Sequence, residues 1–322
     1  MPPISVVLRL SDQCRGLRDC LDSLHAQSIG VERFEVCVSA EGLAEALPED
    51  LQAIRSTLPF RYASGRHSKT SVDSYAGLSV ARGRIVFFVS GDEVLDPCCL
   101  EEHQRTHKEY PDPHVCVLGY TRLRGEAARS PLMHYLADAG CMPCDHPEAS
   151  SGSAMDGSAF FGESRSFKRA FLLEQGALDP RLPLGFEWGE LGYRLHSNGL
   201  KVTRNAAAVT EMARSLSFED ACSHSYRQGR ADRVLVQVHP EPEARAWSQI
   251  DRAESDWEVV EPIFEDVVKA ARELDRFAQE RCRFDLPIDE LATRLLYRSY
   301  AAAFRAHRLL GAVGGVVNGT NP

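Results

Sequence analysis

Residues 85–93 read IVFFVSGDE, so five consecutive apolar residues stand directly before Ser90, Gly91, Asp92 and Glu93. An unbroken apolar run of this length indicates a strand that is covered on both faces, as strands in parallel sheets are. In open α/β sheets, ligands bind beyond the carboxyl ends of the strands. The stretch therefore predicts a buried parallel strand that carries two acidic residues to a ligand site.

Further elements precede this strand along the chain. Strand patterns fall at 4–9 and 34–38, and helical patterns with apolar residues three and four apart fall at 14–27, 43–58 and 72–81. The order strand, helix, strand, two helices, strand predicts a doubly wound α/β sheet. We therefore expect the ligand crevice among the loops that follow the three strands.

The remainder of the chain contains one more strand pattern and then turns helical. A strand is predicted at 114–120, and a turn followed by a helix at 160–175. From Trp257 onward, apolar residues recur at helical spacing, which is typical of helices that pack on one face. The sequence thus predicts an α/β region followed by a C-terminal helical region.

Composition excludes several classes of protein. The chain has 322 residues, a formal net charge of −9 and 43% apolar residues, which is close to globular averages. The acidic balance argues against a surface that coats nucleic acid. No run approaches the ~20 apolar residues of a spanning helix, and the first residues lack the pattern of a secretion signal. We expect a cytoplasmic protein without a membrane span.

Ten cysteines are too dilute in a chain of this length to form a disulfide scaffold. Cys141 and Cys144 stand two residues apart, a spacing that suits half a zinc site or a redox pair. No second pair at this spacing completes a zinc site. We therefore expect a loop with two thiols and no structural zinc.

Five segments resemble, in order, the sequence blocks of family 2 glycosyltransferases. The first resembles that family's opening strand and CLxSLxxQ helix, and the third its segment with the DxD metal motif. The five segments are residues 4–28, 34–42, 76–103, 162–202 and 206–230. Ordered blocks at sensible spacing arise by chance far less often than one motif.

The resemblance implies a GT-A fold, which is a Rossmann-like mixed sheet flanked by helices. It also implies a nucleotide-sugar donor, most simply a UDP-sugar, a divalent cation (Mn or Mg), and inversion at the anomeric carbon. The matched region gives a glycosyltransferase domain at 1–230 and leaves 231–322 as a C-terminal helical extension.

The resemblance assigns donor and metal positions residue by residue. Where the family has its DxD triplet, Ser90 replaces the first acid, Asp92 keeps the last, and Glu93 follows. Asp92 and Glu93 are the candidate metal ligands, because hard cations favour carboxylate oxygens. The tandem aspartates that would receive the nucleoside become Ala40 and Glu41. Candidate donor-binding residues are therefore Glu41, Ser90 and Asp92.

The acceptor hydroxyl needs a general base. The position that the family gives to its catalytic aspartate is Trp188, whose indole cannot accept a proton. Glu187 and Glu190 are the neighbouring carboxylates and the candidate catalytic residues. The closing metal-binding histidine aligns with Met212, beside which Glu211 offers an oxygen ligand.

Three functional hypotheses follow from these residues. In the first, which we favour, the chain is an inverting glycosyltransferase with an altered site, acting on an unknown acceptor. In the second, it is a catalytically inactive descendant that binds a sugar nucleotide or a partner. In the third, it is a transferase with a different donor or nucleophile that uses the loop of Cys141 and Cys144 at the acceptor side. The retained acids favour the first, whereas Ser90, Ala40, Trp188 and Met212 favour the second.

Overall fold

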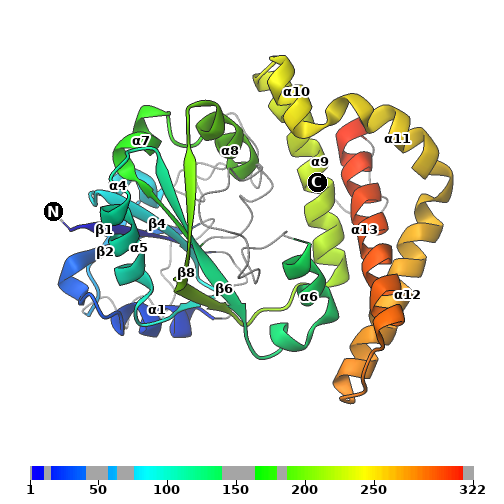
Figure 1. Cartoon of the computed structure of the whole chain (residues 1–322), viewed down its shortest axis with the longest axis horizontal. Coiled ribbons are helices and arrows are strands. Elements are labelled where there is room, and N and C mark those ends of the chain that lie inside the picture. Colours follow the sequence, from blue (N-terminus) through cyan, green and yellow to red (C-terminus); the bar gives the residue numbers. More distant parts are fainter. Residues whose placement is uncertain are drawn as a thin grey trace. The chain divides into compact units, whose positions relative to one another are not determined.

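The chain folds into two compact units, which are described one at a time. The computed structural model describes residues 2–10, 16–40, 57–63, 76–139, 164–179 and 187–314. The first unit comprises Met1–Gly125 and Ala137–Arg214, and the second comprises Glu126–Leu136 and Ser215–Pro322 (Figure 1). Residue 230, where the sequence placed a domain boundary, falls inside one continuous helix, α9 (Phe218–Val238).

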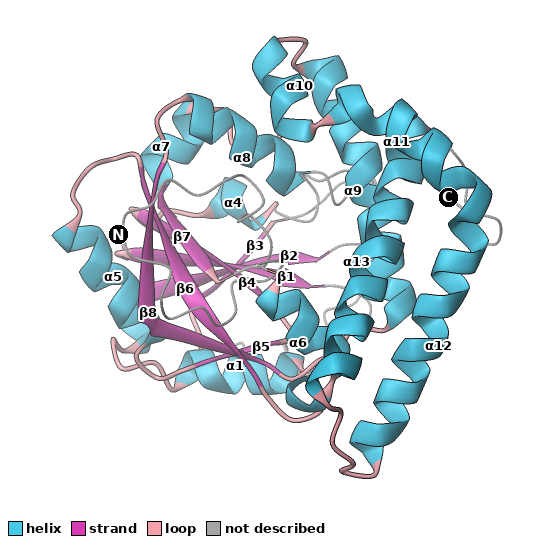
Figure 2. Ribbon diagram, turned by 45° about the vertical axis from the view of Figure 1, so that its right-hand side comes forward, coloured by secondary structure: helices cyan, strands magenta, loops and turns pink. Residues whose placement is uncertain are grey.

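The described residues of the first unit form an eight-stranded mixed sheet in the order β3-β2-β1-β4-β7-β6-β8-β5 (Figure 2). Strands β3, β2, β1 and β4 are parallel, β7 runs antiparallel to both of its neighbours, and β8 runs parallel to β6. The strands are β1 (Ile4–Leu10), β2 (Phe34–Ala40), β3 (Phe60–Tyr62), β4 (Ile85–Ser90), β5 (Glu93–Leu95), β6 (Val115–Leu123), β7 (Arg165–Lys168) and β8 (Lys201–Met212).

Helices cover both faces of this sheet. They are α1 (Leu17–His25), the short 3-10 turn η1 (Val31–Arg33), α4 (Gly77–Val80), α5 (Cys99–Glu109), α7 (Arg169–Glu174) and α8 (Glu187–Ser197). Alternate strand residues enter two separate cores. Val6 and Phe87 pack with α1, whereas Val7 and Phe88 pack with α7 and α8. Each fully buried side chain of this kind contributes roughly 1.5–3 kcal/mol to the free energy of folding.

Most predicted elements of the first unit are confirmed where the structure describes them. The strands expected at 4–9, 34–38, 85–89 and 114–120 are β1, β2, β4 and β6, and the first helix is α1. The helix expected at 43–58 lies almost wholly outside the described residues. The turn and helix expected at 160–175 are wrong in part, because β7 precedes α7 there.

Strand β7 is joined to α5 by a buried polar cluster. The Ser166 hydroxyl lies 2.8 Å from His103 Nδ1 and 2.9 Å from His107 Nε2, and these two histidines stand one turn apart on α5. Burial lowers the pKa of His103 to about 3, and burial with the nearby Lys168 charge lowers the pKa of His107 to about 4. Both imidazoles are therefore neutral at pH 7 and serve packing.

The second unit is helical. Its elements are η2 (Ala127–Arg129), most of α6 (Pro131–Asp138), α9 (Phe218–Val238), α10 (Pro242–Ser248), η4 (Ile250–Arg252), α11 (Ala253–Val260), η5 (Glu261–Ile263), α12 (Phe264–Arg283) and α13 (Glu290–Val313). Residues 126–136 belong here because the Tyr135 ring packs on Tyr297, Tyr300 and Phe304 of α13, with centroids 5.2–5.9 Å apart.

Helices α9 and α13 approach each other very closely. Gly229 of α9 faces the backbone of Arg308, and Gly311 of α13 faces the backbone of Tyr226, so that an added Cβ at either glycine would clash with a carbonyl oxygen. The absence of side chains at these two positions permits the contact.

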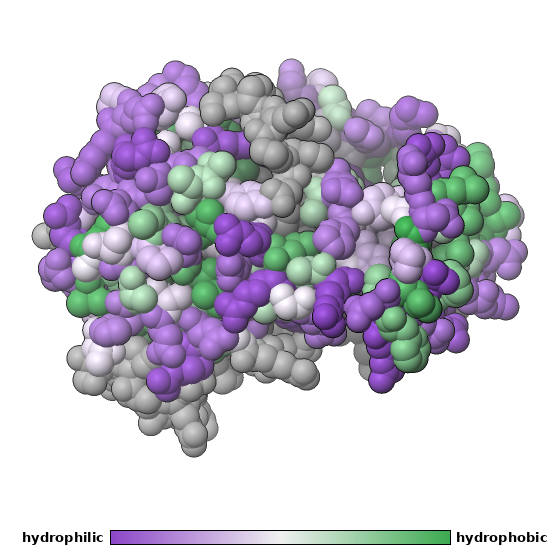
Figure 3. Space-filling model, turned by 60° about the horizontal axis from the view of Figure 1, so that its bottom comes forward, coloured by the Kyte–Doolittle hydropathy of each residue, from purple (hydrophilic) through white to green (hydrophobic). Residues whose placement is uncertain are grey.

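Apolar side chains also stay exposed on this unit, namely Val259, Ile263, Phe277, Phe284, Leu286, Leu291 and Leu295. Figure 3 shows hydrophobic residues gathered on its surface.

Candidate active site

The carboxyl ends of β1 and β4 form the topological switch point of the sheet. From β1 the chain moves to β2 and β3 on one side, and it returns to β4 on the other side. The connections on either side of β1 and β4 therefore run in opposite directions, and in open α/β sheets ligands bind beyond the strand ends at such a point. Asp92 lies at this edge, and the backbone N–H of Gly16, just before α1, donates to Asp92 Oδ1 at 3.4 Å. The predicted position of Asp92 at a strand end is confirmed.

In the turn after β4, side-chain oxygens accept hydrogen bonds from the turn's own backbone N–H groups. The Glu93 side chain is buried and folds back, so that its Oε2 accepts the backbone N–H of Ser90 at 3.0 Å. The Ser90 hydroxyl accepts the N–H of Asp92 at 3.5 Å. Glu93 thus stabilises the turn that presents Asp92, which is a different role from the metal ligand predicted for it.

Arginine side chains reach the same edge from β6 and β8. Met212 of β8 is the partner of Glu93 in β5, and Arg214 follows two residues later. Arg214 Nη1 lies 3.5 Å from Asp92 Oδ2, and the Asp92 side chain is only 10% exposed. Sequence reasoning missed Arg214, although it stands just beyond the position aligned with the metal-binding histidine.

Glu211, which the sequence offered as an oxygen ligand beside Met212, forms ion pairs with two arginines. Its Oε1 lies 3.1 Å from Arg122 and its Oε2 lies 3.3 Å from Arg124, both from the end of β6. Arg124 also approaches Asp19 of α1 at 3.9 Å. The edge next to Asp92 is therefore rich in guanidinium groups.

The three positions considered for the general base, Glu187, Trp188 and Glu190, lie in the first turn of α8, which begins at Glu187. The Trp188 ring packs edge-on against Phe88 with centroids 5.0 Å apart, and the buried Arg165 guanidinium lies 4.3 Å above it. Trp188 is therefore a packing residue of the core.

Glu190 is engaged by a buried ion pair. Its two oxygens lie 2.8 and 2.9 Å from Arg194 Nε and Nη2, and Glu190 is 3% exposed. Arg194 also donates to the carbonyl oxygens of Gln175 and Ala177, which joins α8 to the turn after α7. This bidentate geometry gives Glu190 a structural role. Glu41, Cys141 and Cys144 lie outside the described residues, as does the side chain of Glu187.

Comparison with known proteins identifies the architecture. No family model and no curated protein sequence matches this chain. Mannosyltransferase PcManGT from Pyrobaculum calidifontis, in complex with GDP-Man and Mn2+, matches with TM-score 0.56 and 14% identity over 97% of this chain and 87% of that one. TarS 1-349 from S. aureus matches with TM-score 0.53 and 14% identity, over 97% and 90% of the two chains. The same fragment in complex with UDP gives TM-score 0.53 at 12% identity, with the same coverage.

The chain shares the fold of these solved structures. This confirms the predicted fold class, a mixed α/β sheet flanked by helices with a helical C-terminal region. At 14% identity, the likeness establishes the architecture. In the part of the chain that the structure describes, no helix has both the length and the apolar character to cross a membrane.

A divalent cation, which the resemblance implies, does not fit the donor atoms described at this edge. Such cations take several oxygen ligands. Glu93 is turned toward Ser90, Glu211 is held by two arginines, and Asp92 faces Arg214. Across the described ranges, no group of three or more His, Cys, Asp or Glu side chains could hold a metal ion.

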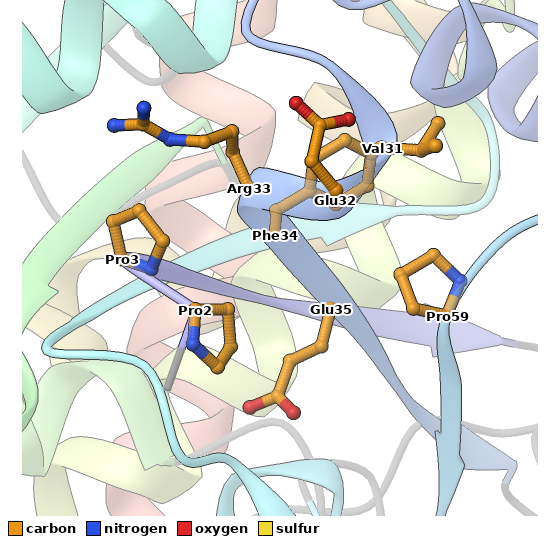
Figure 4. Close-up of a pocket in the computed structure, with 8 residues that line it drawn as sticks. All are labelled: Pro2, Pro3, Val31, Glu32, Arg33, Phe34, Glu35 and Pro59. Carbon is orange, nitrogen blue, oxygen red and sulfur yellow. The ribbon is translucent and has the colours of Figure 1, made fainter.

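A cavity of about 550 Å³ lies at the amino ends of the strands, opposite the end that carries Asp92 (Figure 4). It is lined by residues at or near the amino ends of the first three strands: Pro2, Pro3, Val31, Glu32, Arg33, Phe34, Glu35 and Pro59. Burial raises the pKa of Glu35, but hydrogen bonds from Ser5, the Arg82 backbone and Arg61 outweigh it and lower the pKa overall. Glu35 is thus a satisfied structural carboxylate, and the cavity lies far from the switch point.

Proposed function

We propose that the chain is an inverting glycosyltransferase that moves a sugar from a nucleoside-diphosphate donor, most simply a UDP-sugar, to an unknown acceptor. The observation that carries this proposal is Asp92, which lies with Gly16 and Arg214 at the switch point between β1 and β4. Support also comes from two structures of the same fold, one in complex with UDP and one with GDP-Man.

The reaction exchanges two bonds at the anomeric carbon of the donor sugar. The bond to the diphosphate oxygen breaks and its electron pair leaves with the diphosphate, while the acceptor oxygen bonds to the opposite face of the carbon. The acceptor proton goes to a general base. We assign the base to Glu187, because Trp188 packs in the core and Glu190 is held by Arg194.

A thermal-shift panel tests the proposed function. It contains UDP, GDP, UDP-GlcNAc and GDP-Man, each measured with Mn2+ and with EDTA. A ligand that binds only the native state should stabilise it by about 2.7 kcal/mol at 100 times its Kd, which raises Tm measurably. Glu32→Ala, at the far cavity, is the matched control and should respond as the wild type does.

Donor breakdown then separates the first two hypotheses. We expect the stabilising nucleotide sugar to be hydrolysed slowly, with release of its nucleoside diphosphate. Binding without any release in the presence of candidate acceptors would favour the catalytically inactive alternative. If none of the four compounds shifts Tm in either buffer, the proposed function is wrong.

A further inference from the structure

Helices α12 and α13 of the second unit form an antiparallel hairpin, and one face of this hairpin packs on α9 (Figure 2). Arg272 of α12 forms an ion pair with Glu219 of α9 at 2.9 Å. Gly311 of α13 meets the α9 backbone at Tyr226. These contacts identify the packed face of both helices.

The other side of α12 carries an apolar row that contact with α13 does not use. The row for α13 contains the buried Val268, Ala271 and Ala278, together with Asp275, which accepts a hydrogen bond from the Tyr300 hydroxyl of α13. The second row advances by steps of four and three residues, a spacing typical of a helix that packs against another helix. Its members are Ile263, Val267, Ala270, Leu274, Phe277, Arg281 and Phe284.

This second row is open where its side chains are largest. Ile263, Phe277 and Phe284 are exposed, and Phe284 keeps 71% of its surface accessible. The guanidinium of Arg281 lies 5.7 Å from the centre of the Phe277 ring, so the arginine within the row covers part of this aromatic side chain.

Leu291 and Leu295 extend the open face onto α13. They lie one helical turn apart and are 78% and 55% exposed. Gly311 comes twenty residues after Leu291, which places the two residues about 200° apart around the helix. The exposed leucines therefore lie on the side of α13 away from α9, as the second row of α12 does.

The open face is large enough for a specific protein contact. Helix α12 has 20 residues and is about 30 Å long. Two packed helices are about 20 Å wide, so the hairpin offers a face of about 600 Å². Two such faces would bury about 1,200 Å², the lower limit of specific interfaces. Apolar patches of this size mark interaction sites.

Charges beside the open face favour a second copy of this chain as its partner. Asp266, Glu273 and Glu280 follow one another at seven-residue spacing on α12, and Arg294 and Arg298 lie beside the exposed leucines of α13. All five side chains are exposed. One half of the face is thus acidic and the other basic, which makes the face complementary to itself. The acidic row would repel the headgroups of an anionic membrane.

We propose that this face is a dimer interface in which α12 of each copy packs on α13 of the other, so that two hairpins form a four-helix bundle. A two-fold axis parallel to the helices produces this arrangement, in which neighbouring helices are antiparallel. The contact between Asp275 and Tyr300 sets the relative levels of the two helices. It places Glu280 within one turn of the level of Arg298, so the axis brings Glu280 near the partner's Arg298.

Sedimentation equilibrium of the full chain from about 0.1 to about 100 μM tests the dimer. We expect a wild-type dimer with Kd below about 10 μM. The double variant Phe277→Gln, Leu295→Gln should raise Kd at least about 100-fold, which is about 2.7 kcal/mol. Glutamine is a good helix former and both sites are exposed, so circular dichroism should remain unchanged. Leu173→Gln, at an exposed leucine of α7, is the matched control and should dimerise as the wild type does.

Charge reversal tests which helices meet. Glu280→Lys and Arg298→Glu should each weaken the dimer about 10-fold, because each interaction occurs twice across a two-fold axis. The double variant should return to within about 3-fold of the wild type. If α12 packed on α12 of the other copy, acidic rows would face each other, and Glu280→Lys would strengthen the dimer. That result would overturn the proposed arrangement.

The dimer itself is contradicted if the wild type stays monomeric up to about 100 μM, or if the Phe277→Gln, Leu295→Gln variant dimerises with the wild-type Kd. Vesicles of phosphatidylglycerol and phosphatidylcholine provide a further comparison. A wild-type monomer that cosediments with these vesicles, and a double variant that does not, would assign the face to a membrane surface and overturn the inference.

Discussion

Glu187→Gln should reduce turnover of the hydrolysed donor by roughly 10²–10⁴-fold, the range in which general bases contribute. Glutamine keeps the size of the side chain and cannot take a proton at pH 7. Donor affinity should stay within about 2-fold, because the base acts on the acceptor and not on the nucleotide. Nucleoside diphosphate release and calorimetry measure the two quantities separately.

Glu190→Gln provides the contrast. Removing one partner of the buried Glu190–Arg194 pair leaves an uncompensated guanidinium and should lower the free energy of unfolding by about 3 kcal/mol. Folded Glu190→Gln should therefore keep its turnover at low temperature. The assignment of the base would be wrong if Glu187→Gln kept full turnover while folded Glu190→Gln lost it.

Gly229→Ala should destabilise the second unit by about 2–4 kcal/mol, a large effect for one methyl group. The new Cβ would meet the backbone carbonyl of Arg308, which cannot rotate away, so α9 and α13 must separate along their contact. Gly311→Ala should act similarly through Tyr226. Urea denaturation followed by far-ultraviolet circular dichroism measures the loss.

The matched control for this prediction is Gly189→Ala. An added Cβ at Gly189 of α8 meets no atom within 4 Å, and alanine is the better helix former. This variant should be neutral or stabilised by up to about 1 kcal/mol. Equal stability of Gly229→Ala and wild type would show that α9 and α13 do not pack as closely as described.

Local sequence pattern was sufficient for the strands that create the site. The apolar run of β4 and the acid that follows it predicted both a buried strand and a residue at its carboxyl end. Strand β7 was missed because its four residues, RSFK, are too few and too mixed to show a period. Its buried Ser166 contacts His103 and His107 of α5, which are about sixty residues away in the sequence.

The site could be predicted only where it depends on neighbours in sequence. Trp188 was excluded as a proton acceptor from its chemistry, and the structure shows its ring packed on Phe88. Arg214 could not be foreseen, because its approach to Asp92 depends on the antiparallel register of two strands more than a hundred residues apart. Such long-range pairings leave no local pattern.

The location of a bound nucleoside diphosphate tests the central claim most directly. A crystal structure of the chain grown with UDP or GDP, whichever stabilises it, gives that location. The account predicts the diphosphate at the carboxyl ends of β1 and β4, beside Asp92. A nucleotide bound instead in the cavity near Pro2, Glu32 and Pro59, at the amino ends of the strands, would contradict it.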